Sequence, residues 1–171
     1  MKNVFFIFLA VIAGIVGAKA LAIHETIPAE TTIALPSAYD AEAVYRYIKV
    51  LRPYSRWDLW PGKGKLYKGS QPHGAYLTTY INDTASLSIR RKESMRPGSL
   101  IVKENYTPAK KLDTISVMYK VEGYNPAAGD WFWARYGDDG KVLKAGKVQA
   151  CIDCHSANKP NDFVMTEDFI K

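Results

Sequence analysis

Hydrophobic and polar positions divide the chain into three parts with different patterns. Residues 4–17 form an unbroken apolar run, residues 23–38 show little periodicity, and the remainder carries the short repeats of a folded domain. In residues 40–50 apolar side chains recur at helical spacing, Asp40 stands where a capping residue is expected, and Pro53 ends the segment. The pattern therefore predicts an extended arm followed by a helix that ends at residue 49 or 50.

Four later segments are rich in aromatic and β-branched residues and are bounded by Gly, Pro, Asn or Asp. They cover residues 74–81, 99–106, 114–121 and 130–136. A short helix is predicted over residues 84–92, between the first two. Because the strands follow one another without long helical crossovers, we predict an α+β fold, a small antiparallel β-sheet with flanking helices.

Residues 1–22 have the three-part layout of a secretory signal peptide. Lys2 supplies the positive charge, the apolar run follows, and residues 18–22 offer two small-x-small cleavage sites. The apolar core is short for a bilayer span, which takes about 20 residues. The competing interpretation is an uncleaved N-terminal anchor interrupted only by Lys19. Both place the folded domain, residues 39–171, outside the cytoplasm, and we expect a periplasmic protein.

Composition narrows the class of protein further. The 171 residues are 47% apolar and 23% charged, which is ordinary for one compact soluble domain. Lys and Arg outnumber Asp and Glu by 23 to 17, but they are scattered rather than gathered in a block that tracks phosphates. We therefore expect no nucleic-acid partner and at most a weak field that attracts anions or an acidic protein.

Both cysteines of the chain lie in one motif, Cys151-Ile152-Asp153-Cys154-His155. The spacing C-x-x-C-H is the attachment signature of c-type haem. On a helix, residues three and four apart share a face, so both sulfurs and the imidazole project from one turn. The thiols then bond to the haem vinyl groups while His155 ligates the iron. The sequence predicts one covalent haem c with its iron, held by Cys151, Cys154 and His155.

The sequence alone also allows other uses of the two cysteines. An exported protein can join them in a disulfide, and a zinc site needs a fourth ligand, for which the only other histidines are His24 and His73. A thioredoxin-like dithiol usually follows an early strand, whereas this pair lies near the C-terminus. Export, the use of both cysteines and the adjacent histidine favour haem.

With these motifs in place, the chain from residue 57 to residue 169 resembles the cytochrome P-460 family, which includes the β-sheet cytochromes c-prime. The matching pieces are the C-x-x-C-H motif, Tyr80-Ile81-Asn82-Asp83, Val102-Lys103-Glu104, Val117-Met118-Tyr119-Lys120, Gly129-Asp130-Trp131 and Asp162-Phe163-Val164-Met165-Thr166. The resemblance implies a small antiparallel sheet with helices, often paired as a homodimer. It also implies one c-type haem with His155 as proximal ligand and an open distal face.

The resemblance also suggests a catalytic residue. Catalytic members oxidise hydroxylamine, and the lysine of their Val-Lys-Glu strand is covalently joined to the haem; that position here is Lys103. The simpler interpretation is a strand lysine that faces solvent or pairs with a haem propionate. By strand alternation Lys103 shares a face with Ile101 and Asn105.

Two departures from the catalytic pattern argue against hydroxylamine turnover. Ile115 or Ser116 stands where catalytic members carry a distal carboxylate, and Leu77 stands where they carry an arginine. Removing protons from a bound nitrogen oxide needs a positioned base. We therefore leave enzyme activity open, as a hydroxylamine-oxidising oxidoreductase, and expect a mainly apolar distal pocket that admits nitric oxide.

The sixth position of the iron is not fixed by the motifs. Met118 and Met165 are candidate ligands, but we expect methionines in such positions to pack in the core. His73 lies in a turn before the first central strand. It could approach the distal side of the haem, but a surface or hydrogen-bonded histidine is expected there.

We therefore expect five-coordinate iron and binding or redox chemistry of nitric oxide or hydroxylamine. The alternative function is an electron-transfer module with a redox partner protein, or a subunit of a larger membrane-bound assembly. Contact with the membrane is expected only if the N-terminal segment is kept.

Overall fold

The structure is a computed structural model that describes residues 33–37 and 40–170. The signal peptide or anchor predicted over residues 1–22, and most of the arm predicted over 23–38, lie outside the described residues. Within the described part, no helix has the length and apolar character needed to cross a membrane.

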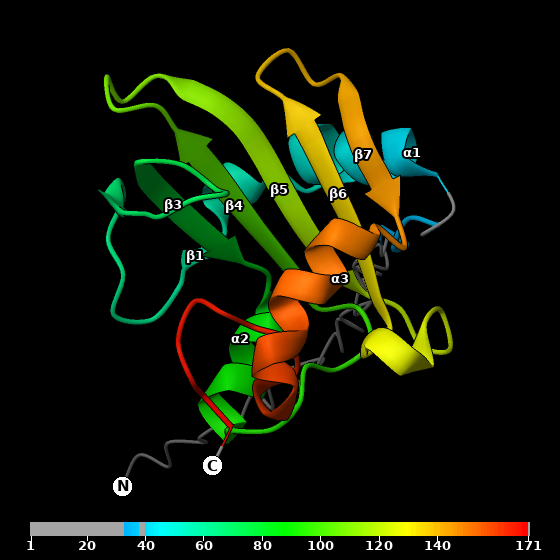
Figure 1. The fold of residues 1–171 in the computed structure, drawn as a ribbon. Coiled ribbons are helices and arrows are strands. Elements are labelled where there is room, and N and C mark those ends of the chain that lie inside the picture. Colours follow the sequence, from blue (N-terminus) through cyan, green and yellow to red (C-terminus); the bar gives the residue numbers. More distant parts are fainter. Residues whose placement is uncertain (1–32, 38–39, 171) are drawn as a thin grey trace, which may run out of the picture. The chain divides into compact units, whose positions relative to one another are not determined.

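One antiparallel sheet forms the centre of the described chain (Figure 1). Its strands pair in the order β1-β3-β4-β5-β6-β7, and β2 pairs with β3 outside this path. The bounds are β1 Asp58–Leu59, β2 Tyr67–Lys68, β3 Tyr76–Ile81, β4 Leu100–Tyr106, β5 Leu112–Lys120, β6 Trp131–Gly137 and β7 Val142–Gly146. The four strands predicted from the sequence are β3 to β6, and the antiparallel α+β fold is confirmed.

Side chains cap the N-termini of two helices, α1 and α2. Their bounds are α1 Ala41–Arg46, η1 Tyr47–Leu51, η2 Tyr54–Arg56, α2 Asp83–Arg91, η3 Pro126–Ala128, α3 Gln149–His155 and η4 Ser156–Asn161. The Asp40 carboxylate accepts the N–H of Ala43 at 2.9 Å and starts α1. The second half of the predicted 40–50 helix is a π-helical turn, η1. Asn82 caps the start of α2, and Lys92, the residue that follows its last turn, has the left-handed conformation.

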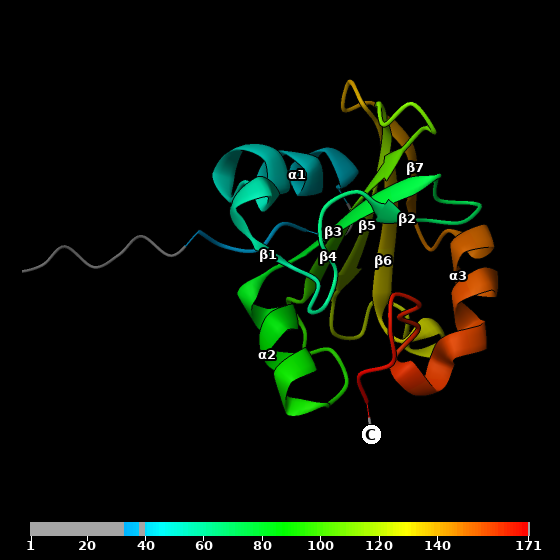
Figure 2. The ribbon, with the colours of Figure 1, turned by 90° about the vertical axis from the view of Figure 1, so that its left-hand side faces the viewer.

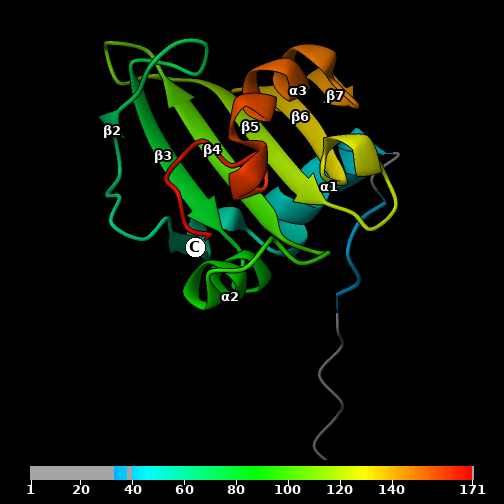
Figure 3. The same cartoon turned by 60° about the horizontal axis from the view of Figure 1, so that its bottom comes forward.

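Helices cover both faces of the sheet, and each face has its own core. Figures 1 and 2 show α1 on one face and α3 on the other, and Figure 3 shows the C-terminal segment crossing the same face as α3. Neighbouring residues of β4 illustrate the division. Leu100 and Val102 lie in the core beneath α1, whereas Ile101 lies in the core on the α3 side.

The register of the sheet places a row of polar side chains on the α3 side. Lys103 of β4 pairs with Ser116 of β5, which pairs with Arg135 of β6, which pairs with Lys144 of β7. Directly paired residues of an antiparallel sheet project to the same face. Four chemically reactive or polar groups from separate strands therefore face α3 together.

Candidate functional site

Helix α3 presents the three residues of the C-x-x-C-H motif together. Cys151, Cys154 and His155 all line one cavity between the helix and the sheet. Both thiols are free, so the two cysteines form no disulfide here. An exposed hydrogen bond from Gln149 Nε2 to Asp153 Oδ1, at 2.6 Å, spans one turn on the outer side of the helix.

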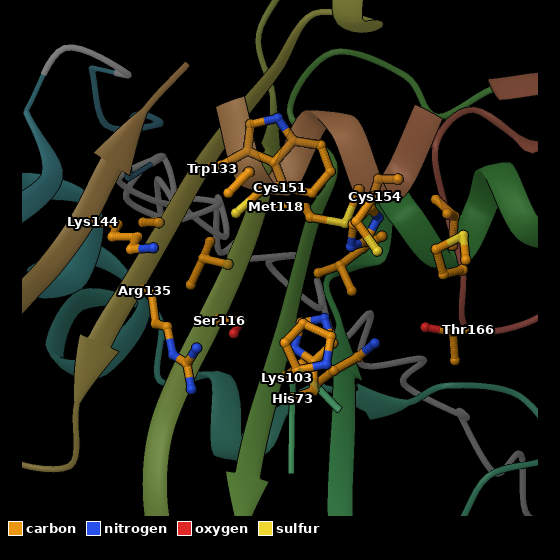
Figure 4. A pocket seen from close by; sticks show the side chains of 18 residues that line it. His73, Lys103, Ser116, Met118, Trp133, Arg135, Lys144, Cys151, Cys154 and Thr166 are labelled. Atoms are coloured by element: carbon orange, nitrogen blue, oxygen red, sulfur yellow. The ribbon is translucent and has the colours of Figure 1, made fainter. Parts of the chain in front are cut away.

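The cavity has apolar walls with several nitrogen-bearing side chains among them. Figure 4 shows Cys151 and Cys154 near Met118 and Trp133 in the upper part of the view, with Ser116, Lys103 and His73 lower down. The lining residues are Pro72, His73, Ile101, Lys103, Ser116, Val117, Met118, Trp133, Ala134, Arg135, Lys144, Ala150, Cys151, Cys154, His155, Val164, Met165 and Thr166. Among the described residues that line it there is no Asp or Glu.

The imidazole of His155 is held in one orientation. Its Nδ1 lies 2.7 Å from the carbonyl oxygen of Phe163, so the Nδ1–H donates to that oxygen and Nε2 is the nitrogen left available to a metal. The ring also contacts Trp133, with ring centroids 4.6 Å apart. Burial lowers the pKa of His155, although the Phe163 carbonyl works in the opposite direction. The neutral imidazole is the form that ligates a metal.

The Phe163 carbonyl is itself fixed by a buried ion pair. Lys120 Nζ lies 2.6 Å and 2.8 Å from the two carboxylate oxygens of Asp162. Asp162 also accepts the N–H of Met95 at 2.8 Å, and its carbonyl accepts from Trp131 Nε1 at 2.9 Å. Asp162 and Phe163 both adopt left-handed backbone conformations. The segment after η4 is thereby tied to the sheet, with Phe163 placed to receive His155.

Lys103 lies in the cavity with the motif residues. It shares a sheet face with Ile101 and Asn105, as strand alternation predicts, and that face is the one covered by α3. Burial lowers the pKa of Lys103 to about 8. A fraction of this amine is therefore neutral and nucleophilic near neutral pH. A covalent bond between Lys103 and haem stays a prediction.

The two residues that the sequence offers at the position of the missing distal carboxylate lie on opposite faces of the sheet. Ser116 lines the cavity, whereas Ile115 is fully buried in the opposite core. Leu77 lies on the same sheet face as Lys103 and is buried. Of the two residues named for that position, the serine therefore borders the cavity and the isoleucine does not.

Three further candidates from the sequence line the cavity. His73, for which a surface position, a hydrogen bond or an approach to the distal side was considered, is half-buried, with its ring 6.1 Å from that of His155, centroid to centroid. Burial, with smaller effects of Lys103 and His155, lowers the pKa of His73 to about 4. Met165 was expected to pack in the core, which is wrong, because it is 48% exposed at the cavity. Met118 is buried and lines the cavity.

Sequence reasoning missed Arg135 and Lys144 as members of the site. Arg135 Nε donates to Thr114 Oγ1 at 3.1 Å, and an Nη lies 3.9 Å from the Asp113 carboxylate. The signal for Arg135 was available, because it stands two positions after Trp133 in a strand and so shares its face. Lys144 belongs to β7, which was not predicted.

The residues around the cavity fit a c-type haem. Two free thiols and an imidazole with one nitrogen occupied form the required donor set on one helix face. The indole nitrogen of Trp133 is buried without a partner, and Arg135 and Lys144 bring positive charge. These donors suit the carboxylates of a porphyrin. A zinc site is not supported, since no group of three or more His, Cys, Asp or Glu lies within metal-binding reach in the described part of the chain.

Comparison with known proteins agrees with this donor set. The curated proteins give no match to the chain. The family model for cytochrome P460 matches residues 54–166, a stretch that includes β4 with Lys103 and α3 with the C-x-x-C-H motif. The resemblance stated from the sequence is confirmed by this match. Because the match covers more than half of the chain, the protein belongs to the cytochrome P460 family.

Proposed function

We propose that this haem cytochrome is an exported c-type protein with one covalent haem, and that it binds or does redox chemistry on a small nitrogen oxide. Family membership implies haem and iron. The N-terminal layout of residues 1–22 supports export to the periplasm. Nitric oxide is the favoured ligand.

The observation that carries the proposal is the arrangement of α3 over the cavity. Cys151 and Cys154 line the cavity and would hold the haem edge, and His155 would offer Nε2 to the iron from the same helical turn. The haem iron supplies ligand binding and one-electron chemistry when bound. Phe163 and Trp133 keep the His155 ring from rotating, so the direction of its free nitrogen is set by the protein.

The lining of the cavity favours nitric oxide over hydroxylamine as the physiological ligand. Oxidising hydroxylamine requires a group that takes its protons. No Asp or Glu lines the cavity among the described residues, and Ser116, one of the two residues expected at the matching position, does line it. Nitric oxide is small and neutral and needs no base to bind. Lys103 is the candidate for catalytic or covalent chemistry, because its partly neutral amine lies in the same cavity.

An electron-transfer cytochrome is the second candidate. It is favoured by the imidazole of His73, which faces His155 across the cavity. Six-coordinate iron that ignores nitric oxide is the signature of that function, and a redox partner protein is its requirement.

Anaerobic titration of the reduced holoprotein with nitric oxide separates these functions. We expect the absorption spectrum to shift and to saturate at one nitric oxide per haem. Hydroxylamine with an electron acceptor should give no turnover above that of free haem. A reduced spectrum that stays unchanged with excess nitric oxide would refute the proposed ligand and favour the electron carrier.

A further inference from the structure

The cavity contains a second imidazole, which the motif does not account for. His73 belongs to the turn that leads into β3, and its ring centroid lies 6.1 Å from that of His155 with the ring planes 86° apart. Both rings line the same cavity between α3 and the sheet. Figure 4 shows His73 and Lys103 on the sheet side of the cavity, below Cys154.

The spacing of the two rings matches that of two ligands on one metal. Two imidazoles on opposite sides of an iron have centroids about 6 Å apart, since each metal–nitrogen bond is about 2 Å and each ring centre lies about 1 Å beyond its nitrogen. Nearly perpendicular ring planes are compatible with this arrangement, because each ring turns about its own bond. The separation of the two ring centroids is therefore compatible with a shared iron.

The backbone brings His73 to the cavity by a close approach to the end of β4. The His73 N–H donates to the carbonyl of Ser70 at 3.1 Å and closes a tight turn. At Gly74 a side chain would meet the carbonyl oxygen of Tyr106 at 2.8 Å, so only glycine permits this approach. The Ala75 N–H donates to that same carbonyl at 3.0 Å. Contacts with the end of β4 therefore fix the position of the turn that carries His73.

A fully buried amide lies beside His73 with an unpartnered acceptor. The Nδ2 of Asn105 faces the carbonyl and hydroxyl oxygens of Thr114 at 3.1 Å and 3.2 Å, and the Ser116 hydroxyl at 2.9 Å. Its Oδ1 has no partner within hydrogen-bond distance, yet it lies near enough to His73 to act on that ring. A metal-binding histidine usually donates its other N–H to such an oxygen. Asn105 Oδ1 is therefore the candidate acceptor for the second ring nitrogen of His73.

We propose that His73 is the axial ligand opposite His155 when no external ligand is present, with Asn105 as its positioning residue. The inference rests on the proposed haem attachment and deepens it. It replaces the expectation of five-coordinate iron with six-coordinate iron in the resting protein. A nitrogen oxide then binds by displacing His73, so the turn before β3 controls access to the iron.

Low-temperature electron paramagnetic resonance of the oxidised holoprotein tests the ligand directly. We expect a low-spin signal from the unchanged protein and from Gln71→Ala, which alters an exposed residue of the same turn. His73→Ala should give a high-spin signal, and added imidazole should restore the low-spin one. Binding of azide to the oxidised iron should be at least about tenfold faster in His73→Ala, because no internal ligand has to leave.

The outcomes separate this inference from the proposed function. A high-spin signal from the unchanged protein overturns the role of His73, and this holds even if the variant fails to fold. A low-spin signal that persists in His73→Ala also overturns it and assigns the ligand to another side chain, such as Lys103 or Met118. In both cases covalent haem and nitric oxide binding stand. A chain without covalent haem instead refutes the proposed function.

Discussion

Replacing Asp162 with asparagine tests how the proximal side of the site is held. Asp162 and Lys120 form an ion pair at 2.6 Å whose side chains are only 7% and 12% exposed. Asp162→Asn keeps the size of the side chain and its tolerance of the left-handed conformation, but it leaves the Lys120 charge without a counterion. Removing one partner of a buried pair typically costs about 3–5 kcal/mol. Because Lys120 also contacts the face of Trp131, we expect the lower end, about 3 kcal/mol.

Urea unfolding followed by tryptophan fluorescence measures this loss. The slope of free energy against urea should stay the same while the midpoint falls. For a chain of this size about 3 kcal/mol corresponds to a fall in melting temperature of roughly 6–12 °C. The matched control is Glu167→Gln, which removes an exposed pair in which Lys63 lies 3.8 Å away. That change should cost less than about 1 kcal/mol.

Comparing the two variants shows whether the Asp162–Lys120 ion pair holds the segment that carries Phe163. If Asp162→Asn costs no more than Glu167→Gln, the ion pair does not fix the segment that carries Phe163. The orientation of His155 would then need another explanation.

Three further predictions concern the neighbouring groups. Gly129→Ala should destabilise the fold by about 1–2 kcal/mol in the same urea assay, since Gly129 has φ +66 and an added methyl group would lie 2.8 Å from the Phe163 ring; an unchanged midpoint would contradict this. Burial and then the Glu104 charge raise the pKa of Tyr80 to about 12, above its ordinary 10.0. As pH rises, the unfolded chain therefore loses the Tyr80 hydroxyl proton before the folded chain does, and the free energy of unfolding falls between pH 10 and 12. Glu104→Gln should make this fall smaller, which unfolding curves taken across that pH range would measure. If Lys103 is joined to the haem, proteolysis should yield its peptide linked to porphyrin, and Lys103→Met should abolish a red-shifted Soret band; a free Lys103 peptide from the unchanged protein would rule out the bond.

Much of the fold follows from local sequence patterns. The four central strands were predictable because each combines β-branched and aromatic residues with clear turn signals, as in Trp131–Gly137. Strand β7 was missed because Val142–Gly146 is short and largely exposed, so it lacks a buried alternating face. The π-helical turn Tyr47–Leu51 was also missed, since its residues repeat at ordinary helical spacing.

The candidate site was predictable only where its residues are neighbours in the sequence. Cys151, Cys154 and His155 lie within one helical turn, so their spacing alone brings them together. His73 reaches the cavity through the packing of a turn against the end of β4, which no local pattern encodes. Likewise, the choice of Ser116 over Ile115 depends on the register of three strands.

Covalent retention of haem tests the central claim most directly. The full chain should be produced in a host that assembles c-type haem, denatured, and examined by haem staining and intact mass. We predict one haem per chain that resists extraction, and its complete loss when Cys151→Ala and Cys154→Ala are combined. A colourless chain, or a haem that separates on denaturation, would contradict the account.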